Sequence, residues 1–274
     1  MSGSAGDRWR AALAAWAIPD AILAAAPESP WVFPVELFAS RADAAPVQIT
    51  PSNDRALEAL PEGGSVLDVG CGAGAASLPL AGRAGTLIGV DSSQEMLDAF
   101  RERAERAGVA SESVLGRWPD VADRVPAADV VVCNHVAYNA PDLHTFAARL
   151  TDHARERVVF ELTPEHPTAN LNPLWMRFHG LQRPDRPTAD DAVDVLREAG
   201  FDPEREDWTA PATGGFARKA DLVAWIRRRL CLPAERDPEV EQALAGHVEE
   251  RGGLFGFDTR RLVTLWWPGT THGP

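Results

Sequence analysis

Cysteine is scarce in this chain of 274 residues, which contains only Cys71, Cys133 and Cys231. An odd number without paired or metal-type spacing excludes a disulfide framework and a cysteine-based metal centre, so no metal site is expected. Sparse cysteines of this kind are typical of the reducing cytoplasm. We expect buried, inert thiols, with a redox pair between Cys71 and Cys133 as the less favoured alternative.

Long apolar runs are also missing. No window approaches the roughly 20 apolar residues that a membrane-spanning helix needs. Residues 1–27 are apolar but interrupted by charged residues and prolines, unlike the cationic start and continuous apolar stretch of a signal peptide. The sequence therefore predicts a cytoplasmic protein without a membrane partner.

Positive charge is in short supply, because 27 Lys and Arg face 40 Asp and Glu, giving a net charge of −13. A surface of this sign repels phosphate backbones, which argues against a nucleic-acid partner. The basic run at 227–229 is more typical of a solvated face paired with acids than of a nucleic-acid site.

From residue 65 onward, short apolar strands alternate with helix-length segments. Strands are predicted at 65–70, 86–91, within 113–120, at 128–138, 157–163, 205–210 and 260–269. Helices are predicted at 7–18, 52–60, after the first strand, and at 92–108, 142–154, 188–201, 220–232 and 238–252. The alternation predicts an α/β fold, with a mostly parallel, Rossmann-like, seven-stranded sheet and helices on both faces.

The stretch "VLDVGCGAG" (66–74) follows the first strand with three glycines in the spacing G-x-G-x-G. In open parallel sheets ligands bind outside the carboxyl ends of the strands, and glycines there permit close backbone approach. The dinucleotide fingerprint G-x-G-x-x-G requires a glycine where Ala75 stands. Asp68, two residues before the first glycine, disfavours a phosphate at this turn and favours a cationic ligand.

A second acid lies at the distance that such a fold requires. Asp91 ends the second strand about 20 residues beyond the glycines, where the fold places the acid that holds a ribose diol. The helix that follows is predicted to begin with a capping box formed by Ser92 and Glu95.

This combination resembles class I S-adenosylmethionine-dependent methyltransferases, from about residue 50 to 165 and more weakly to 269. The resemblance implies S-adenosylmethionine as cofactor, S-adenosylhomocysteine as product, and methyl transfer to oxygen, nitrogen or carbon of a small, partly apolar acceptor. The acceptor itself is not identified. A monomer or homodimer is expected.

The resemblance also implies roles for individual residues. Asp91 would accept from the ribose hydroxyls, with Ser92 and Met96 near the adenine, and Asp68 would act near the ammonium group. Arg117 replaces the usual acid of "LGRWPD", so backbone contacts and Trp118 are expected to hold the adenine. The implied cofactor-binding residues are Asp68, Gly70, Cys71, Gly72, Gly74, Asp91, Ser92, Met96, Arg117, Trp118, Asn134 and His135.

Methyl transfer needs a base only when the acceptor is an alcohol, a phenol or a protonated amine. His135, after the fourth strand, is the best-placed candidate, and His166, after the fifth, is the second. Tyr138 and His179 are weaker candidates.

The resemblance leaves additional segments for binding the acceptor. We expect a helical lid segment at 1–50 and a methyltransferase domain at 51–274, with 164–187 and 211–258 as lid or acceptor-site additions. An aromatic-lined acceptor cavity is the hypothesis for Trp31, Phe33, Trp118, Trp175 and Phe178, although core packing is the more common role of such residues.

Two alternatives remain open from the sequence. A non-catalytic protein that binds S-adenosylmethionine or S-adenosylhomocysteine would carry the same motifs. A nicotinamide-dependent oxidoreductase is less favoured, because it leaves Asp68 unexplained.

Overall fold

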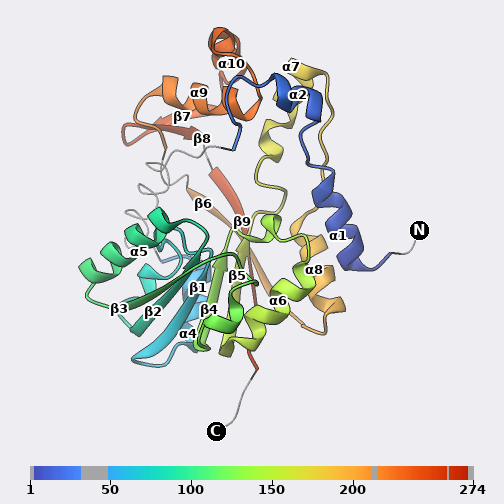
Figure 1. The fold of residues 1–274 in the computed structure, drawn as a ribbon. Helices are drawn as coiled ribbons and strands as arrows, with labels where there is room; N and C mark the ends of the chain where they lie inside the picture. The colour runs from blue at the N-terminus through green and yellow to red at the C-terminus, as the bar shows by residue number, and fades with distance from the viewer. Residues whose placement is uncertain (1–2, 32–48, 212–214, 258, 271–274) are drawn as a thin grey trace.

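A computed structural model describes residues 3–31, 49–211, 215–257 and 259–270, and Figure 1 shows a central sheet with helices around it. The sheet has seven strands in the order β3-β2-β1-β4-β5-β9-β6. They are β1 (Gly64–Val69), β2 (Ala84–Asp91), β3 (Ala110–Leu115), β4 (Ala128–Asn134), β5 (Ala154–Leu162), β6 (Glu204–Pro211) and β9 (Thr259–Pro268). Because only β9 runs antiparallel to its neighbours, the prediction of a mostly parallel seven-stranded sheet is confirmed.

Helices cover both faces of the sheet. Side chains alternate along β4, where Val130 and Val132 join one hydrophobic cluster and Val131 joins the other. The first cluster packs under α4 (Pro51–Ala59) and α5 (Gln94–Arg106). On the opposite face lie α1 (Ala5–Ala14), α6 (Leu143–Asp152) and α8 (Ala189–Glu198).

Two local predictions near the glycine turn are wrong. The expected helix after β1 is reduced to a short 3-10 turn, η2 (Leu78–Leu80), because Pro79 cannot donate within a regular helix. Ser93 rather than Ser92 caps α5, with its hydroxyl oxygen accepting from the Met96 N–H at 3.4 Å. Other 3-10 helices are η3 (Ala122–Arg124), η4 (Ala137–Asn139), η5 (Ala169–Leu171) and η6 (Ala234–Arg236).

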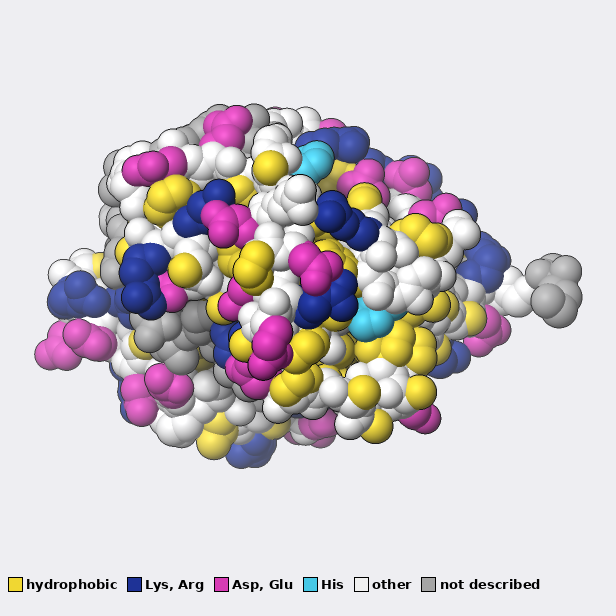
Figure 2. All heavy atoms as spheres, turned by 90° about the horizontal axis from the view of Figure 1, so that it is seen from above, with side chains coloured by type: hydrophobic (Ala, Val, Ile, Leu, Met, Phe, Trp, Pro, Cys, Tyr) yellow, Lys and Arg dark blue, Asp and Glu magenta, His cyan; other side chains and the backbone are white. Residues whose placement is uncertain are grey.

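A further group of elements, which we name the upper layer, lies beyond the carboxyl ends of the parallel strands (Figure 1). Its members are α2 (Asp20–Ala25), α7 (Asn172–His179), α9 (Lys219–Arg229), α10 (Asp237–Ala243), β7 (Val248–Arg251) and β8 (Leu254–Phe257). They share a separate hydrophobic cluster that contains Trp175, Ile226 and Val240. Seen from above, its surface mixes acidic, basic and apolar side chains (Figure 2).

The predicted helix at 238–252 is wrong in its second half. Helix α10 ends at Ala243, and residues 248–257 form the β7–β8 hairpin instead. Gly252 and Gly253 turn this hairpin with φ of 56° and 79°, values that glycine adopts at no steric cost. The Gly-Gly pair was the signal for this turn.

The N-terminal segment joins the upper layer to the sheet. In α1, Trp9 is fully buried, and its indole N–H donates to the Ala140 carbonyl at 2.8 Å. Further along, the Trp16 ring stacks on His166 with centroids 3.9 Å apart, and the Arg183 guanidinium lies 5.4 Å from the same ring. Residues 3–26 therefore connect both parts of the molecule.

None of the helices in the described ranges is both long and apolar enough to cross a bilayer.

Candidate cofactor and acceptor site

The glycine turn after β1 is tightly packed on one side and open on another. Gly70 has φ of 71°, and a Cβ there would lie 2.4 Å from the Val136 side chain. Gly72 has φ of 50°, but a Cβ there would meet nothing within 4 Å. The packing at Gly70 brings the loop after β4 against the turn, and the open backbone at Gly72 lets a ligand approach closely.

Asp91, at the end of β2, bridges the turn and the start of α5. Its Oδ2 accepts from the Gly72 N–H, and its Oδ1 accepts from the Ser93 N–H, both at 2.9 Å. Each carboxylate oxygen keeps a further lone pair for a ligand hydroxyl. The carboxylate is thus held beside the open backbone, an arrangement that fits a ribose diol.

Asp68 is 1% exposed, and its Oδ2 accepts from the Ser77 hydroxyl at 2.6 Å. Its Oδ1 is buried and has no hydrogen-bond partner within the described ranges. Burial raises the pKa of this carboxyl to about 7, and the nearby charge of Asp91 adds to the shift. An unpaired, buried acceptor next to the turn fits a ligand that brings an ammonium group.

The end of β4 carries two polar residues towards the same region. Asn134 has a buried Oδ1 without a hydrogen-bond partner among the described residues. His135 has φ of +63°, which is unusual for a residue with a side chain. Its backbone N–H donates to the Glu161 carbonyl at 2.8 Å, and its Nε2 lies 2.9 Å from the Glu161 Oε1.

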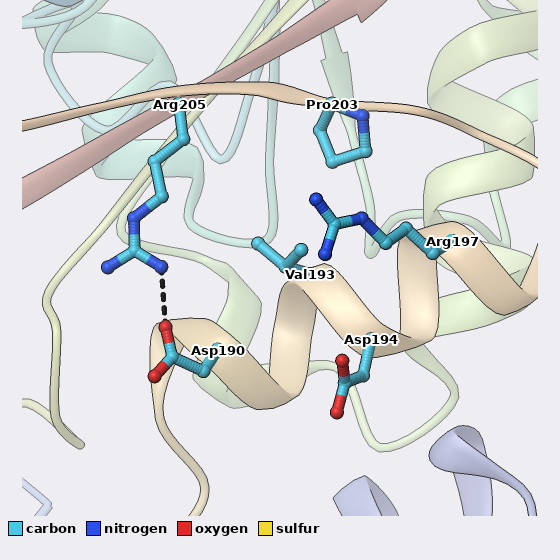
Figure 3. A pocket seen from close by; sticks show the side chains of 6 residues that line it. All are labelled: Asp190, Val193, Asp194, Arg197, Pro203 and Arg205. Carbon is cyan, nitrogen blue, oxygen red and sulfur yellow. Dashed lines mark hydrogen bonds and ion pairs between the residues drawn. The ribbon is translucent and has the colours of Figure 1, made fainter.

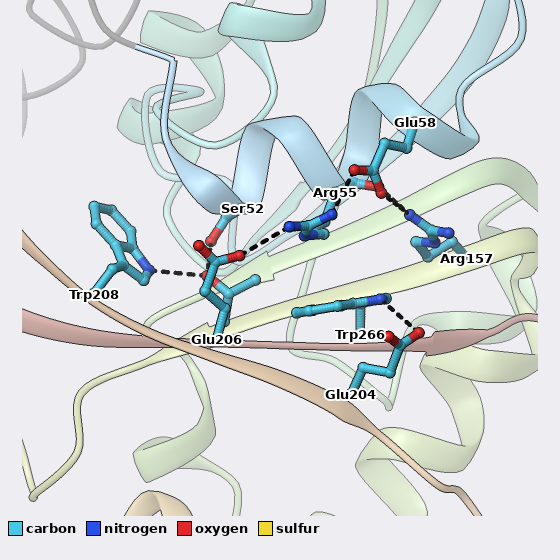
Figure 4. Close-up of polar contacts among 9 residues, drawn as sticks. Ser52, Arg55, Glu58, Arg157, Glu204, Glu206, Trp208 and Trp266 are labelled. Atoms are coloured by element: carbon cyan, nitrogen blue, oxygen red, sulfur yellow. Dashed lines mark hydrogen bonds and ion pairs between the residues drawn. The ribbon is translucent and has the colours of Figure 1, made fainter.

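Glu161 belongs to a buried polar network that the sequence analysis missed. Its Oε2 accepts from the Ser52 hydroxyl at 2.6 Å, and Ser52 lies 2.7 Å from the Thr264 hydroxyl. The Trp208 indole N–H donates to Thr264 at 2.9 Å, and Figure 4 shows Ser52 on α4 and Trp208 on β6. An acid within the apolar strand "RVVFEL" was the available signal.

Charged groups keep Glu161 ionised. Burial alone raises its pKa, but the hydrogen bond and charge of His135, followed by Ser52 and Arg260, leave that pKa below its ordinary value. Burial in turn lowers the pKa of Arg260, which the charge of Glu161 opposes. At the ends of β4 and β5, the His135 side chain therefore faces the carboxylate of Glu161.

A separate chain of contacts lies on the outside of this network. Arg55 of α4 pairs with Glu58 and Glu206, and Arg157 also pairs with Glu58 (Figure 4). The Arg55 guanidinium also lies over the Trp266 ring, 4.8 Å from its centroid. These contacts fasten α4, and with it Ser52, to the sheet.

The remaining implied adenine contacts lie in two environments. Ser92 and Arg117 are exposed, and Met96 is partly buried in the first turn of α5. Trp118 is only 6% exposed and packs edge-on against His153, with centroids 5.0 Å apart. Its indole N–H donates to the Phe146 carbonyl at 3.4 Å, so the ring belongs to the core under α6. Its contact with adenine stays a prediction.

The three cysteines are free and buried. Burial raises the pKa of Cys71 and Cys133 well above the ordinary value, with the charge of Asp68 adding to both shifts. Burial also raises the pKa of Cys231. Thiols with these pKa values are unreactive near neutral pH.

The surroundings of His166 differ from those of His135. Its Nδ1 accepts from the Thr168 N–H at 3.3 Å, and its ring is stacked on Trp16. Burial, followed by the charges of Arg183 and Arg229, lowers the pKa of His166 to about 4. A histidine with this pKa is a weak base, so its position favours a packing role.

The two weaker candidates are held by backbone carbonyls. The Tyr138 hydroxyl donates to the Thr163 carbonyl at 2.7 Å, and burial raises its pKa well above the ordinary value. The His179 Nε2 lies 2.7 Å from the Leu230 carbonyl oxygen. Both side chains anchor loops.

The aromatic residues expected around the acceptor are dispersed. Trp175 is 4% exposed inside the upper-layer cluster. Trp118 lies in the other hydrophobic cluster, on the face of the sheet that α1, α6 and α8 cover. Phe178 packs against the upper-layer cluster, and Trp31 is 56% exposed. Phe33 lies outside the described residues. The structure does not bring Trp118 and Trp175 together.

A shallow surface pocket lies away from this region. It is lined by Asp190, Val193, Asp194, Arg197, Pro203 and Arg205 (Figure 3). These residues belong to α8 and the start of β6, at the amino end of the sheet, and Arg205 already pairs with Asp190 and Asp207. Elsewhere, no cluster of three or more His, Cys, Asp or Glu within the described ranges is arranged to hold a metal ion.

Comparison with known proteins gives two kinds of match. Residues 66–157 match the methyltransferase domain family. An uncharacterized protein of Haemophilus influenzae is 34% identical over 207 residues, which cover 74% of this chain and 75% of that protein. Nocamycin O-methyltransferase of Saccharothrix syringae is 40% identical over 91 residues, so the similarity covers only 32% of each chain.

A solved structure resembles nearly the whole chain. The cyclopropane-fatty-acyl-phospholipid synthase-like protein of Lactobacillus casei superimposes with a TM-score of 0.55 at 14% identity. The superposition covers 91% of this chain and 98% of that protein. At this identity the likeness concerns the fold alone.

Proposed function

The chain belongs to the class I S-adenosylmethionine-dependent methyltransferases, and we propose that it methylates a hydroxyl oxygen of a small, partly apolar molecule. S-adenosylmethionine supplies a methyl group on a positively charged sulfur. The methyltransferase family supports turnover, and neither a non-catalytic binding protein nor a nicotinamide enzyme has support.

One observation carries the choice of a hydroxyl. The loop that bears His135 packs against the glycine turn through Val136, and the His135 side chain is 31% exposed. A histidine in this place can accept the proton that an alcohol or phenol loses on methylation. An amine that is already neutral does not require such a base. Nocamycin O-methyltransferase, which matches part of the chain, transfers to oxygen by its name.

Residues of the turn would hold the cofactor. We assign the ribose hydroxyls to Asp91 and the ammonium group to Asp68, whose Oδ1 is buried and has no hydrogen-bond partner among the described residues. Gly72 would face the ligand with its backbone, and Asn134 would lie beside the sulfonium. Ser92, Met96, Arg117 and Trp118 remain the proposed surroundings of the adenine.

The upper layer would cover the acceptor. It lies beyond the carboxyl ends of the parallel strands and is built from parts of the three segments expected to add a lid. Closure over these strand ends would exclude water from the reacting atoms. Buried, unreactive thiols are consistent with a cytoplasmic location, which we also propose.

The test is a screen for the acceptor. The purified chain with S-adenosylmethionine is offered catechol, phenols, primary alcohols, carboxylic acids and amines, and S-adenosylhomocysteine formation is measured. We expect hydroxylated compounds to be methylated, with kcat about 10²–10⁴-fold lower in His135→Ala.

His144→Ala is the matched control, since His144 is exposed on α6. Turnover of amines alone, or wild-type kcat in His135→Ala, contradicts the proposal.

A further inference from the structure

Arg260, at the start of β9, carries a charge that no acid of the described ranges pairs with directly. Its side chain is half-buried, yet neither an ion pair nor a hydrogen bond joins its guanidinium to another described residue. Arg55 and Arg157, which lie against the same sheet, each pair with acids. The five N–H donors of Arg260 are therefore available to water or to a ligand.

The register of β9 places Arg260 at the edge of the sheet where the strands of the proposed site end. Strand β9 runs antiparallel to β5, and Leu162, the last residue of β5, is paired with Val263. Arg260 precedes Val263 on β9, so it lies beyond the end of β5, towards the upper layer (Figure 1). The guanidinium thus belongs to the region that the upper layer would cover.

The alternation of side chains along β9 shows which face of the sheet Arg260 shares. Thr264 faces α4, because its hydroxyl lies 2.7 Å from the Ser52 hydroxyl. Residues an even number apart in a strand point to the same face, so Arg260 lies on this face together with Glu161. Trp208, whose indole N–H donates to Thr264, adds an aromatic ring there. A cation and an apolar surface therefore lie on one face near this edge.

Glu161 does not neutralise Arg260 by direct contact. Burial lowers the pKa of Arg260, and the charge of Glu161 opposes that shift. Both carboxylate oxygens of Glu161 are already occupied, by His135 at 2.9 Å and by the Ser52 hydroxyl at 2.6 Å. The two charges therefore interact without a hydrogen bond between them, and the guanidinium keeps its donors for another group.

We propose that Arg260 binds a carboxylate of the acceptor, so that the substrate is a hydroxylated carboxylic acid. The inference rests on the proposed function, because it assumes that a hydroxyl is methylated at this edge of the sheet. A guanidinium holds a carboxylate through two parallel N–H···O bonds, which fix direction as well as position. In the strand order β1-β4-β5-β9, a carboxylate at Arg260 leaves the hydroxyl to point back towards the ends of β4 and β1.

The charge of the whole chain adds to the need for such a residue. A net charge of −13 repels carboxylic acids from most of the surface. A guanidinium in a half-buried place offsets this repulsion locally, because charges attract more strongly where water is excluded. A neutral hydroxylated compound gains nothing from the same contact, so Arg260 distinguishes acids from their neutral analogues.

The experiment compares each acid with its own primary amide, which has nearly the same shape but no charge. The full chain with S-adenosylmethionine is given 4-hydroxybenzoate, 4-hydroxyphenylacetate and 4-hydroxycinnamate, and the three corresponding amides. Formation of S-adenosylhomocysteine gives kcat/KM, and NMR of the product identifies the methylated oxygen. We expect kcat/KM to be at least about 10-fold higher for the best acid than for its amide, with the methyl group on the hydroxyl.

Substitutions assign this preference to the guanidinium. Arg260→Gln should lower kcat/KM for the acids about 10–100-fold, mainly through KM, and leave the amides within about twofold. Arg260→Lys keeps the charge but not the paired donors, so its kcat/KM for the acids should lie between those of wild type and Arg260→Gln. Arg261→Gln is the matched control, since Arg261 is exposed and pairs with Glu165 at 3.4 Å.

Three results overturn the proposal. Wild-type protein that prefers none of the acids to its amide excludes a carboxylate site, and methylation of the carboxylate itself places that group at the cofactor instead. Equal losses for acids and amides in both Arg260 variants assign the residue a structural role. A fall in S-adenosylhomocysteine affinity in Arg260→Gln, measured by calorimetry, assigns it to the cofactor.

A binding measurement separates this inference from the proposed function. Calorimetry of the protein with S-adenosylhomocysteine bound compares 4-methoxybenzoate with 4-methoxybenzamide, neither of which has a hydroxyl to methylate. We expect the acid to bind at least about 10-fold more tightly than the amide in wild type and to lose that advantage in Arg260→Gln. If this holds while only amines are methylated, the proposed transfer to a hydroxyl fails and the carboxylate site stands. Equal affinities for the two probes in wild type overturn the carboxylate site, whichever acceptor is methylated.

Discussion

The turn beside β1 and the upper layer differ in how the chain builds them. The turn and its acids lie within residues 66–91, and its contacts join near neighbours such as Gly72 and Asp91. The upper layer draws its core from α2, α7, α9 and α10, which are separated by more than 200 residues from first to last. The turn proposed to hold the cofactor is thus local in sequence, whereas the upper layer is assembled only by folding.

This difference explains why the function of one region can be predicted from the sequence more readily than that of the other. Residues of a local turn are held at fixed spacing, so their chemistry is recognisable in a short stretch. Residues that meet only through long-range packing leave no such pattern. The sequence therefore indicates the cofactor, whereas it does not identify the acceptor.

The largest expected effect is a loss of folding stability caused by a substitution in the upper layer. Trp175→Ala removes a ring that is 4% exposed in the upper-layer cluster, so unfolding should cost about 3–5 kcal/mol less. Chemical denaturation measures the change, and the affinity for S-adenosylhomocysteine should stay near wild type. Trp31→Ala, at a site 56% exposed, is the control. A large loss of cofactor affinity in Trp175→Ala breaks the comparison.

The next effect concerns the local half. Asp91→Ala removes the acceptor of two backbone N–H groups and the proposed partner of the ribose. We expect S-adenosylhomocysteine binding to weaken by about 1.5–3 kcal/mol, measured by calorimetry. Asp98→Ala, on the exposed side of α5, should leave the affinity unchanged. Equal affinities in both variants would exclude Asp91 from the site.

A smaller effect depends on pH. Burial raises the pKa of Asp68 to about 7, so its stabilising contribution to the ligand-free fold is complete below about pH 4 and is lost as the pH rises through 7. A ligand ammonium group favours the ionised form. Affinity for S-adenosylhomocysteine should therefore rise between pH 6 and 8, by up to about tenfold per unit below 7, with proton release.

Asp68→Asn removes the titrating group. Calorimetry in buffers of different ionisation enthalpy should then show no proton release and a flat pH dependence. A pH dependence that survives the substitution assigns it to another group.

The smallest effect is expected at the pocket of Figure 3. Arg205→Gln removes exposed ion pairs to Asp190 and Asp207, and such pairs contribute about 0–1 kcal/mol. Thermal unfolding should change little, and turnover with the best acceptor should stay the same. A clear loss of turnover would extend the functional region to the outer face of α8.

Much of the fold was predictable because hydrophobic periodicity encodes it. The strands and most helices follow from apolar patterns, and Asp91 follows from its distance to the turn. The β7–β8 hairpin was missed because residues 238–252 also carry a helix-like pattern, and only the pairing of 248–251 with 254–257 decides between them.

The site was predictable only in part. Glu161 stood in plain view as an acid in an apolar strand, but its partner depends on the register that sets it across from Asn134. Trp118 was expected beside the adenine, yet packing against His153 places its ring in the core. Spacing along the chain contains neither the register nor that packing.

The position of β9 between β5 and β6 determines when these strands can pair during synthesis. Strand β6 leaves the ribosome well before β9, yet among the described residues β9 is the strand it pairs with in the sheet. Until residues 259–268 emerge, β5 keeps an open edge and β6 has nothing to pair with. Unpaired edges of this kind recruit other chains, so the nascent chain is exposed to aggregation until residues 259–268 have emerged.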